Sequence, residues 1–333
     1  MTGRGARRRR RSGSLLVITL WLIIILSVLA VAIGRYLSIE VRLTRYRVAR
    51  EQARALARSG IYLAMQRLAQ DGQDNAYDWL GDSWTVFPQT GSQSDPAMWV
   101  VPLGNEGREQ EPAPRQLEIT IVDEDRKLDV NTLDTLTAAQ RDQLLGSDQA
   151  AQAIIAYEDQ DTAGSWETPV LDPPYYPKNG PVVALEELVG VPGVTPDVFH
   201  QLHEFTYAVP EAVPMTKVNI NTAGREVLVA AGLPVLAEAI IGFRQQGHYF
   251  KSLTPSVETD GGPPPFDPAD TEFLNARGRL TVASQVFTIT STGRMRHPAA
   301  SHRIQATVRR QASEDPKVQL GGETFRILAW KDG

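Results

Sequence analysis

The stretch LLVITLWLIIILSVLAVAI, residues 15–33, contains nineteen residues and no charge. At 1.5 Å per residue, a helix of this length extends for about 28 Å, close to the thickness of the hydrocarbon core of a bilayer. The stretch therefore predicts a transmembrane helix. Arginines at 7–11 precede it and favour a cytoplasmic N-terminus, although Arg35, Arg42 and further arginines beyond the stretch weaken that bias.

The helical pattern continues past the apolar stretch. Apolar or small residues recur at steps of three and four as far as residue 68, and no proline occurs between residues 15 and 70. This spacing predicts one continuous helix of about 55 residues whose second half is amphipathic. Its small residues would allow another helix to approach closely; they are Ala53, Ala57, Gly60 and Ala64.

Three interpretations of the N-terminus compete: a single-pass anchor, a secretory signal peptide cleaved after Ala32, and a leader of the prepilin type cleaved after Gly13. A removable signal peptide rarely continues into a long helix. A short basic segment ending in Gly13, directly followed by an apolar helix from Ser14, favours the prepilin type, in which cleavage leaves the helix on the mature protein.

Strand patterns flank a long helical region. Alternating apolar and polar residues predict strands at 117–123, 285–292 and 303–309, and we also expect a short strand at 98–103 and a last edge strand at 324–330. Helical patterns occupy most of the intervening region, at 137–157, 184–188, 195–205, 223–231 and 235–246. The expected fold is α+β, with the long helix on a small antiparallel sheet and a large inserted all-α domain. We expect Trp79, Trp84 and Trp99 to cover one face of the long helix. The proline-rich loop 261–270 need not have an ordered structure.

Charge and composition restrict the function. Lys and Arg number 34 against 39 Asp and Glu, for a net charge of −5, and removal of the six arginines among the first thirteen residues leaves −5 − 6 = −11. An acidic body is atypical of nucleic-acid binding, which needs a basic surface. The absence of cysteine excludes disulfides and thiolate chemistry. The five histidines form no known catalytic motif, and His200 with His203 is a surface pair, so we expect no enzyme.

Two segments inside the helical region resemble helix-hairpin-helix modules. They begin at Ala184 and Lys217, and each contains a helix, a Gly/Pro turn and a second helix. Backbone N–H groups at such a hairpin can hold a phosphate. A membrane-anchored DNA receptor of the competence type is therefore the alternative function, although the second hairpin has few basic residues, Lys217, Arg225, Arg244 and Lys251.

Several motifs in order resemble the minor pseudopilins of the K type, the GspK family of type II secretion systems. They are the Gly13/Ser14 junction, KLDVNTL after a strand, YEDQDTAGSWE leading to PPYYPKNGPVVALEELVGVPGV, and KVNINTA before the second hairpin, followed by VASQVFTITSTGRM and HRIQATVRR. The resemblance extends over nearly the whole chain. In most pilins the fifth mature residue is glutamate, whereas here it is Ile18, as in this family.

The resemblance implies a domain organisation and a function. It divides the chain into a prepilin leader (1–13), a transmembrane segment (14–33), an amphipathic extension of the same helix (34–70), the first part of the pseudopilin domain (71–126), the inserted helical domain (127–275) and strands that return to the sheet (276–333). It implies a protein of the inner membrane with a cytoplasmic N-terminus and a periplasmic body. Ile18 in place of the glutamate, and the bulk of the inserted domain, further predict a position at the tip of the pseudopilus. The implied partners are the I-type and J-type minor pseudopilins, the major pseudopilin, the assembly platform and prepilin peptidase, and no nucleic acid.

The acidic segment YEDQDTAGSWE is the candidate metal site. Carboxylate oxygens on a loop are suitable ligands for calcium, and the helical domain of the family holds calcium. The resemblance implies Asp159, Asp161 and Glu167 as ligands, with Asp172 and Asn179 as weaker candidates. The segment departs from the family pattern at Tyr157, Ala156 and Trp166, and a solvated acidic turn is the alternative.

Overall fold

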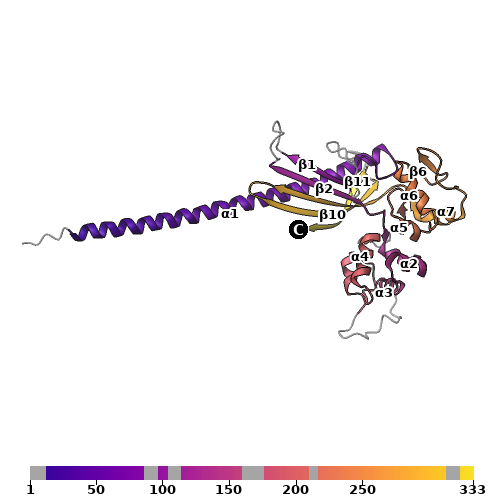
Figure 1. Cartoon of the computed structure of the whole chain (residues 1–333), viewed down its shortest axis with the longest axis horizontal. Coiled ribbons are helices and arrows are strands. Elements are labelled where there is room, and N and C mark those ends of the chain that lie inside the picture. Colours follow the sequence, from indigo (N-terminus) through magenta and orange to yellow (C-terminus); the bar gives the residue numbers. More distant parts are fainter. Residues whose placement is uncertain (1–12, 86–96, 104–113, 160–175, 210–216, 313–322) are drawn as a thin grey trace, which may run out of the picture.

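The computed structural model describes residues 13–85, 97–103, 114–159, 176–209, 217–312 and 323–333. One long helix, α1 (Gly13–Asp74), dominates the molecule, and its N-terminal half projects away from a body of sheet and helices (Figure 1). The prediction of a single unbroken helix is confirmed, and α1 contains 62 residues. No proline interrupts it, so its length of about 93 Å follows from an unbroken backbone hydrogen-bond ladder.

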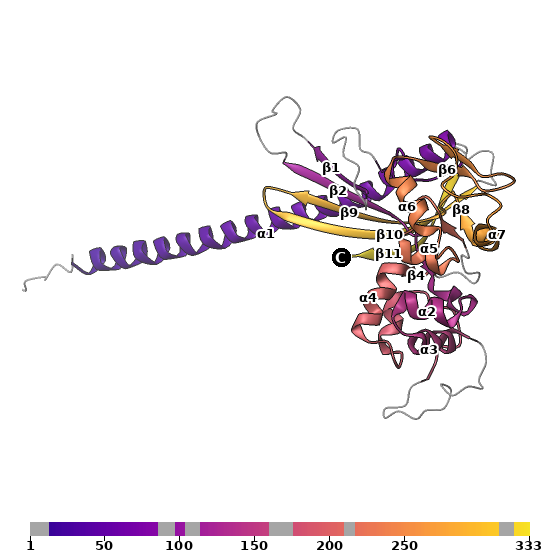
Figure 2. The ribbon, with the colours of Figure 1, turned by 45° about the vertical axis from the view of Figure 1, so that its right-hand side comes forward.

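A five-stranded antiparallel sheet lies against the second half of α1 (Figure 2). Its strands, in spatial order, are β1 (Ala97–Leu103), β2 (Arg115–Asp123), β9 (Val286–Met295), β10 (Ala300–Ala312) and β11 (Glu323–Asp332). Every strand predicted from alternation is present. Along β2 the side chains alternate, and Leu117, Ile119 and Ile121 face inward.

The core between α1 and the sheet explains the small residues of the helix. Ala57 and Ala64 are fully buried there with Ile61 and Leu68, and the indoles of Trp84 and Trp99 complete the same core. The expectation that the small residues serve approach by a partner helix is wrong, because they face the chain's own sheet.

The third tryptophan lies elsewhere. Trp79 stacks on Tyr249 of the helical region, with ring centroids 4.3 Å apart. The prediction that three tryptophans cover one face of α1 therefore holds for Trp84 and Trp99 but not for Trp79.

The helical region connects β2 to β9, which are neighbours in the sheet, so the chain leaves and re-enters the sheet at adjacent strands. It has a hydrophobic core of its own. Its elements are β3 (Leu128–Asp129), η1 (Val130–Thr135), α2 (Ala138–Leu145), α3 (Asp148–Glu158), η2 (Leu185–Gly190), α4 (Pro196–Phe205), β4 (Thr206–Tyr207), β5 (Val218–Asn219), α5 (Arg225–Ala230), α6 (Ala237–Gln245), β6 (Tyr249–Ser252), β7 (Glu258–Asp260), α7 (Thr271–Ala276), η3 (Arg277–Arg279) and β8 (Leu280–Thr281). β8 pairs with β5, so the region continues beyond residue 275.

Local signals explain where these helices begin and end. Thr137 and Gln140 form a capping box at the start of α2, and Gly146 ends it in the left-handed conformation at φ 69°. The single helix predicted at 137–157 is therefore two, and the one predicted at 184–188 is a 3-10 helix.

The proline-rich loop 261–270 is packed, contrary to expectation. Its Phe266 is buried between Phe250 and Phe273, with ring centroids 5.8 and 4.8 Å away. One aromatic side chain therefore anchors a segment whose composition alone is typical of disorder.

Candidate functional site

Most of the exposed large apolar side chains among the described residues lie on the first half of α1. Ile18 is 56% exposed and Trp21 is 61% exposed, and every large apolar side chain from Leu15 to Val48 is exposed. The most apolar part of α1 is long enough to cross a membrane, and none of it is buried within the chain. A surface of this size needs a bilayer or other protein chains around it.

The predicted processing site lies at the N-terminus of this helix. Gly13 is the first residue of α1, and Ser14 follows it within the first turn. The first turn contains no acidic residue. Ile18 lies one turn further along and exposes an apolar side chain where most pilins have a carboxylate.

The structure describes only part of the predicted calcium site. Asp159 directly follows α3 as its C-cap residue. Asn179 lies beside the same helix end, because its backbone N–H donates to the carbonyl oxygen of Tyr157 at 2.9 Å. Its backbone is left-handed at φ 53°. Asp161, Glu167 and Asp172 lie outside the described residues.

Sequence reasoning missed Glu158, which adjoins this site. One oxygen of Glu158 and one of Asp159 are buried and accept no hydrogen bond within the described residues. Burial, together with the nearby Asp134, raises the pKa of Glu158 to about 8. Helical spacing could have identified it, because Glu158 follows the buried Ile154 by four residues.

A second group of buried acids joins the helical region to the sheet. Asp123 ends β2, and its Oδ2 accepts hydrogen bonds from the hydroxyls of Thr222 and Ser284 at 2.6 and 2.7 Å. Asp125 accepts one from the Tyr207 hydroxyl at 3.2 Å, and a backbone N–H just before β9 donates to its other oxygen. Burial raises the pKa of both acids, that of Asp125 to about 8. These bonds fix the two crossings between the sheet and the helical region.

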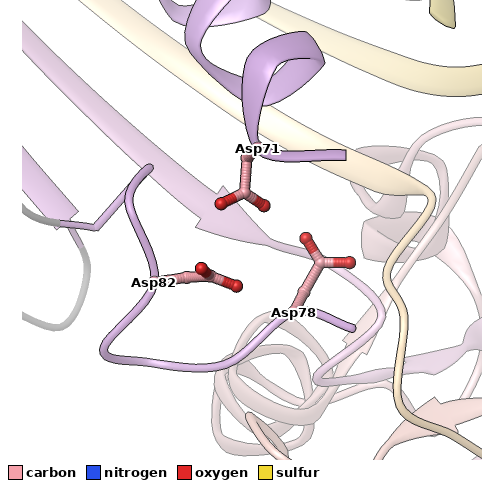
Figure 3. Close-up of side chains that lie close together, drawn as sticks. All are labelled: Asp71, Asp78 and Asp82. Carbon is pink, nitrogen blue, oxygen red and sulfur yellow. The ribbon is translucent and has the colours of Figure 1, made fainter. Parts of the chain in front are cut away.

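Three more acids gather where α1 ends (Figure 3). Asp71, Asp78 and Asp82 are all buried, and each offers an oxygen within 4.8 Å of the others. Burial raises the pKa of Asp71 and of Asp78 to about 7 each. Sequence reasoning missed this group as well, and the run DGQDNAYDWLGD, which begins in the last turn of the long helix and continues beyond it, was the available signal.

The residues considered for chemistry or DNA binding are engaged within the chain. His200 lies 3.9 Å from Glu204, and His203 packs edge-on against Phe199. Three basic side chains of the second hairpin also have internal partners: Arg225 pairs with Glu238, Arg244 donates to the carbonyl oxygen of Ala223, and Lys251 pairs with Asp260. These contacts leave little positive charge for a phosphate backbone.

Neither a protein-family model nor a curated protein sequence matches the chain. A solved structure does: a chain of the crystal structure of the GspK–GspI–GspJ complex from the type 2 secretion system of enterotoxigenic Escherichia coli. The match has a TM-score of 0.60 at 17% sequence identity, and it covers 87% of this chain and 99% of that chain. It extends over the sheet and the helical region together, and it agrees with the resemblance carried by the motifs. The chain therefore has a GspK-like fold.

Proposed function

We propose that this protein is a minor pseudopilin of a type II secretion system. The observation that carries the proposal is the combination of a GspK-like body with an N-terminal helix whose first half is apolar and exposed. Prepilin peptidase would cleave between Gly13 and Ser14, and the new amine would be methylated. Before assembly, α1 spans the inner membrane, with the N-terminus in the cytoplasm and the sheet and helical region in the periplasm.

We further propose that it occupies the tip of the pseudopilus and helps to start its assembly for the export of folded proteins. Two features support the tip. Ile18 cannot neutralise the terminal amine of a subunit above, as the glutamate of a repeated subunit would. The helical region between β2 and β9 also adds bulk that would obstruct a subunit stacked on this one (Figure 1).

The proposed partners follow from the exposed helix. The I-type and J-type minor pseudopilins, and below them the major pseudopilin, would cover the apolar surface of residues 15–48 once α1 leaves the bilayer. Ala53, Ala57, Gly60 and Ala64 are excluded from this contact because the chain's own sheet covers them. The inner-membrane assembly platform would receive the complex.

Calcium at the acidic loop belongs to the same proposal. Asp159, Asp161 and Glu167 would supply the carboxylates, and Asn179 and Asp172 the additional oxygens. The buried oxygen of Asp159 that accepts no hydrogen bond within the described residues supports this, because a cation would satisfy it.

The test of the function is to locate the protein on sheared pseudopili with gold-labelled antibody. We expect label at one end of each filament and loss of exported folded protein on deletion of the gene. Label distributed along the shaft would refute the proposed position at the tip of the pseudopilus. Normal export together with loss of DNA uptake would instead favour the competence-type receptor.

A further inference from the structure

The three acids at the end of α1 converge from two segments. Asp71 lies in the last turns of the helix, and Asp78 and Asp82 lie in the loop that follows. Their exposed fractions are 0%, 0% and 7%. Figure 3 shows the three carboxylates turned toward a common centre. This arrangement brings like charges together out of water, which is unfavourable unless something compensates them.

Hydrogen bonds satisfy only half of the oxygens. One oxygen of each acid has a donor: Ser83 Oγ at 2.8 Å for Asp71, Asn75 Nδ2 at 3.2 Å and Ser83 N at 3.1 Å for Asp82, and Ser284 N at 2.7 Å for Asp78. The other oxygen of each, Asp71 Oδ2, Asp78 Oδ1 and Asp82 Oδ2, is buried and accepts no hydrogen bond within the described residues. The Arg310 guanidinium lies 3.2 Å from Asp78 Oδ1 and 3.8 Å from Asp71 Oδ2, so Asp82 Oδ2 alone of the three has neither a hydrogen bond nor an ion pair within the described residues.

One cation of the chain reaches the group. The guanidinium of Arg310 on β10 lies 3.2 Å from Asp78 and 3.8 Å from Asp71, and it also donates to the carbonyl oxygen of Leu68. The charge of this guanidinium opposes the effect of burial on the pKa of Asp71 and Asp78. Against three ionised acids, its single positive charge would leave two negative charges. A divalent cation would match that deficit.

The spacing of the three acids is short enough for one calcium ion to contact all of them. Two oxygens bound to one ion are separated by at most twice the metal–oxygen distance, which is roughly 4.6–5.2 Å for calcium and roughly 4.0–4.2 Å for magnesium. The three acids offer oxygens within 4.8 Å of one another. We propose that Asp71, Asp78 and Asp82 form a calcium-binding site that joins the end of α1 to the loop after it.

Such an ion would stabilise the junction of three elements. Asp78 already accepts from the backbone N–H of Ser284, which precedes β9, and Arg310 belongs to β10. A bound calcium would therefore fix the end of α1 against both strands. This site is separate from the acidic loop at Asp159, which lies at the end of α3 inside the helical region. The proposal also does not depend on the function proposed above.

Calorimetry with CaCl₂ on the chelator-treated full chain in detergent tests the site. We expect the wild type to bind one more calcium ion than Asp82→Asn. In an Asp159→Asn chain, where the acidic-loop site is removed, we expect the one remaining calcium ion to bind at this site. Asp74→Asn is the matched control, because Asp74 is an exposed acid in the last turn of α1, and it should bind like the wild type. Equal calcium stoichiometry and affinity in the wild type and Asp82→Asn would overturn the proposal.

Melting curves test whether a folding defect, and not loss of a ligand, explains weaker calcium binding by Asp82→Asn. In chelator, Asp82→Asn should melt at or above the wild-type temperature, because it removes one of three crowded charges. In calcium, the wild type should gain more stability than the variant. Asp71→Asn should behave in the same way. A wild type that gains no more from calcium than either variant would show that the acids are compensated by protons instead, and the site would not exist.

Discussion

Gly293 on β9 lies directly against the backbone of Ala53 on α1. A Cβ atom added to the glycine would overlap the carbonyl oxygen of Ala53, and Leu56 and Ala57 would be within 2.9 Å of it. Gly60 makes the reciprocal approach from the helix, where a Cβ would meet Ser291 and Leu117. The helix and the sheet therefore touch through two glycines, which sets how closely α1 lies on the body.

Replacing Gly293 with alanine should destabilise the protein by about 1–3 kcal/mol, because the obstructing atom belongs to a helix backbone that cannot rotate away. Urea unfolding of the full chain in detergent measures this loss. Gly242→Ala is the matched control, since Gly242 lies in α6 with no atom near its added methyl group, and it should be neutral or stabilising. Equal stability of the two variants would contradict the close packing.

Replacing Asp125 with asparagine should remove part of the pH dependence of stability. Burial raises the pKa of Asp125 to about 8, so between about pH 4 and pH 8 the folded state keeps a proton that the unfolded chain has lost. The free energy of unfolding therefore falls as the pH rises through this window, by up to about 1.4 kcal/mol per pH unit for this proton. Asparagine resembles the protonated acid and can still pair with Tyr207.

Melting temperatures at pH 5 and pH 8 check this expectation. The variant should lose less stability than the wild type over this interval, and its advantage should be largest at pH 8. Asp74→Asn, which changes an exposed acid, should follow the wild type. A variant with the same pH slope as the wild type would mean that Asp125 is ionised in the folded protein.

The long helix and the sheet could be predicted from the sequence because their signals are local. Steps of three and four without proline specify α1, and strict alternation specifies β2. The pattern of small residues in α1 correctly indicated a close contact but not its partner, because periodicity defines a face and not what covers it. Ala53 and Gly60 therefore face the chain's own sheet.

The buried acids could not be predicted for a related reason. Asp71, Asp78 and Asp82 occur in a polar, glycine-containing run that is typical of an exposed loop. They are buried because the loop folds back over the end of α1, where Trp84 inserts into the core. Long-range packing decides this, as it decides that Phe266 orders a proline-rich segment.

Cleavage of the chain between Gly13 and Ser14 is expected in cells that have a prepilin peptidase. Mass spectrometry of the purified protein should find a mature chain that begins with a methylated Ser14. Gly13→Leu should leave the full-length precursor, because a bulky residue would obstruct the peptidase, whereas Gly13→Ala should be processed poorly at most. A mature chain that begins at Ile33 would instead indicate signal peptidase.

Calcium should also bind at the acidic loop of the helical region. In an Asp82→Asn background, where only this site should remain, chelator should lower the melting temperature and calcium should restore it. Free calcium at a hundred times its dissociation constant should raise the free energy of unfolding by about 2.7 kcal/mol. Asp159→Asn in the same background should abolish the calcium heat in calorimetry. Unchanged calcium heat in that double variant would exclude Asp159 as a ligand.

Replacing Ile18 with glutamate tests why the chain lacks a carboxylate there. In a filament of packed N-terminal helices, the glutamate of an entering subunit neutralises the terminal amine of the subunit above it. A first subunit has none above, so its glutamate would be an unpaired charge in an apolar place, at a cost of at least ~2.5 kcal/mol at the helix centre. Ile18 is apolar and exposed on α1, so it avoids that cost.

We therefore expect Ile18→Glu to reduce the amount of the protein that is recovered together with the other minor pseudopilins, and to reduce secretion. Ile18→Leu is the apolar control and should stay at wild-type levels. Long filaments made of the glutamate variant alone would show that residue 18 permits a place within the shaft, and the tip assignment would fail.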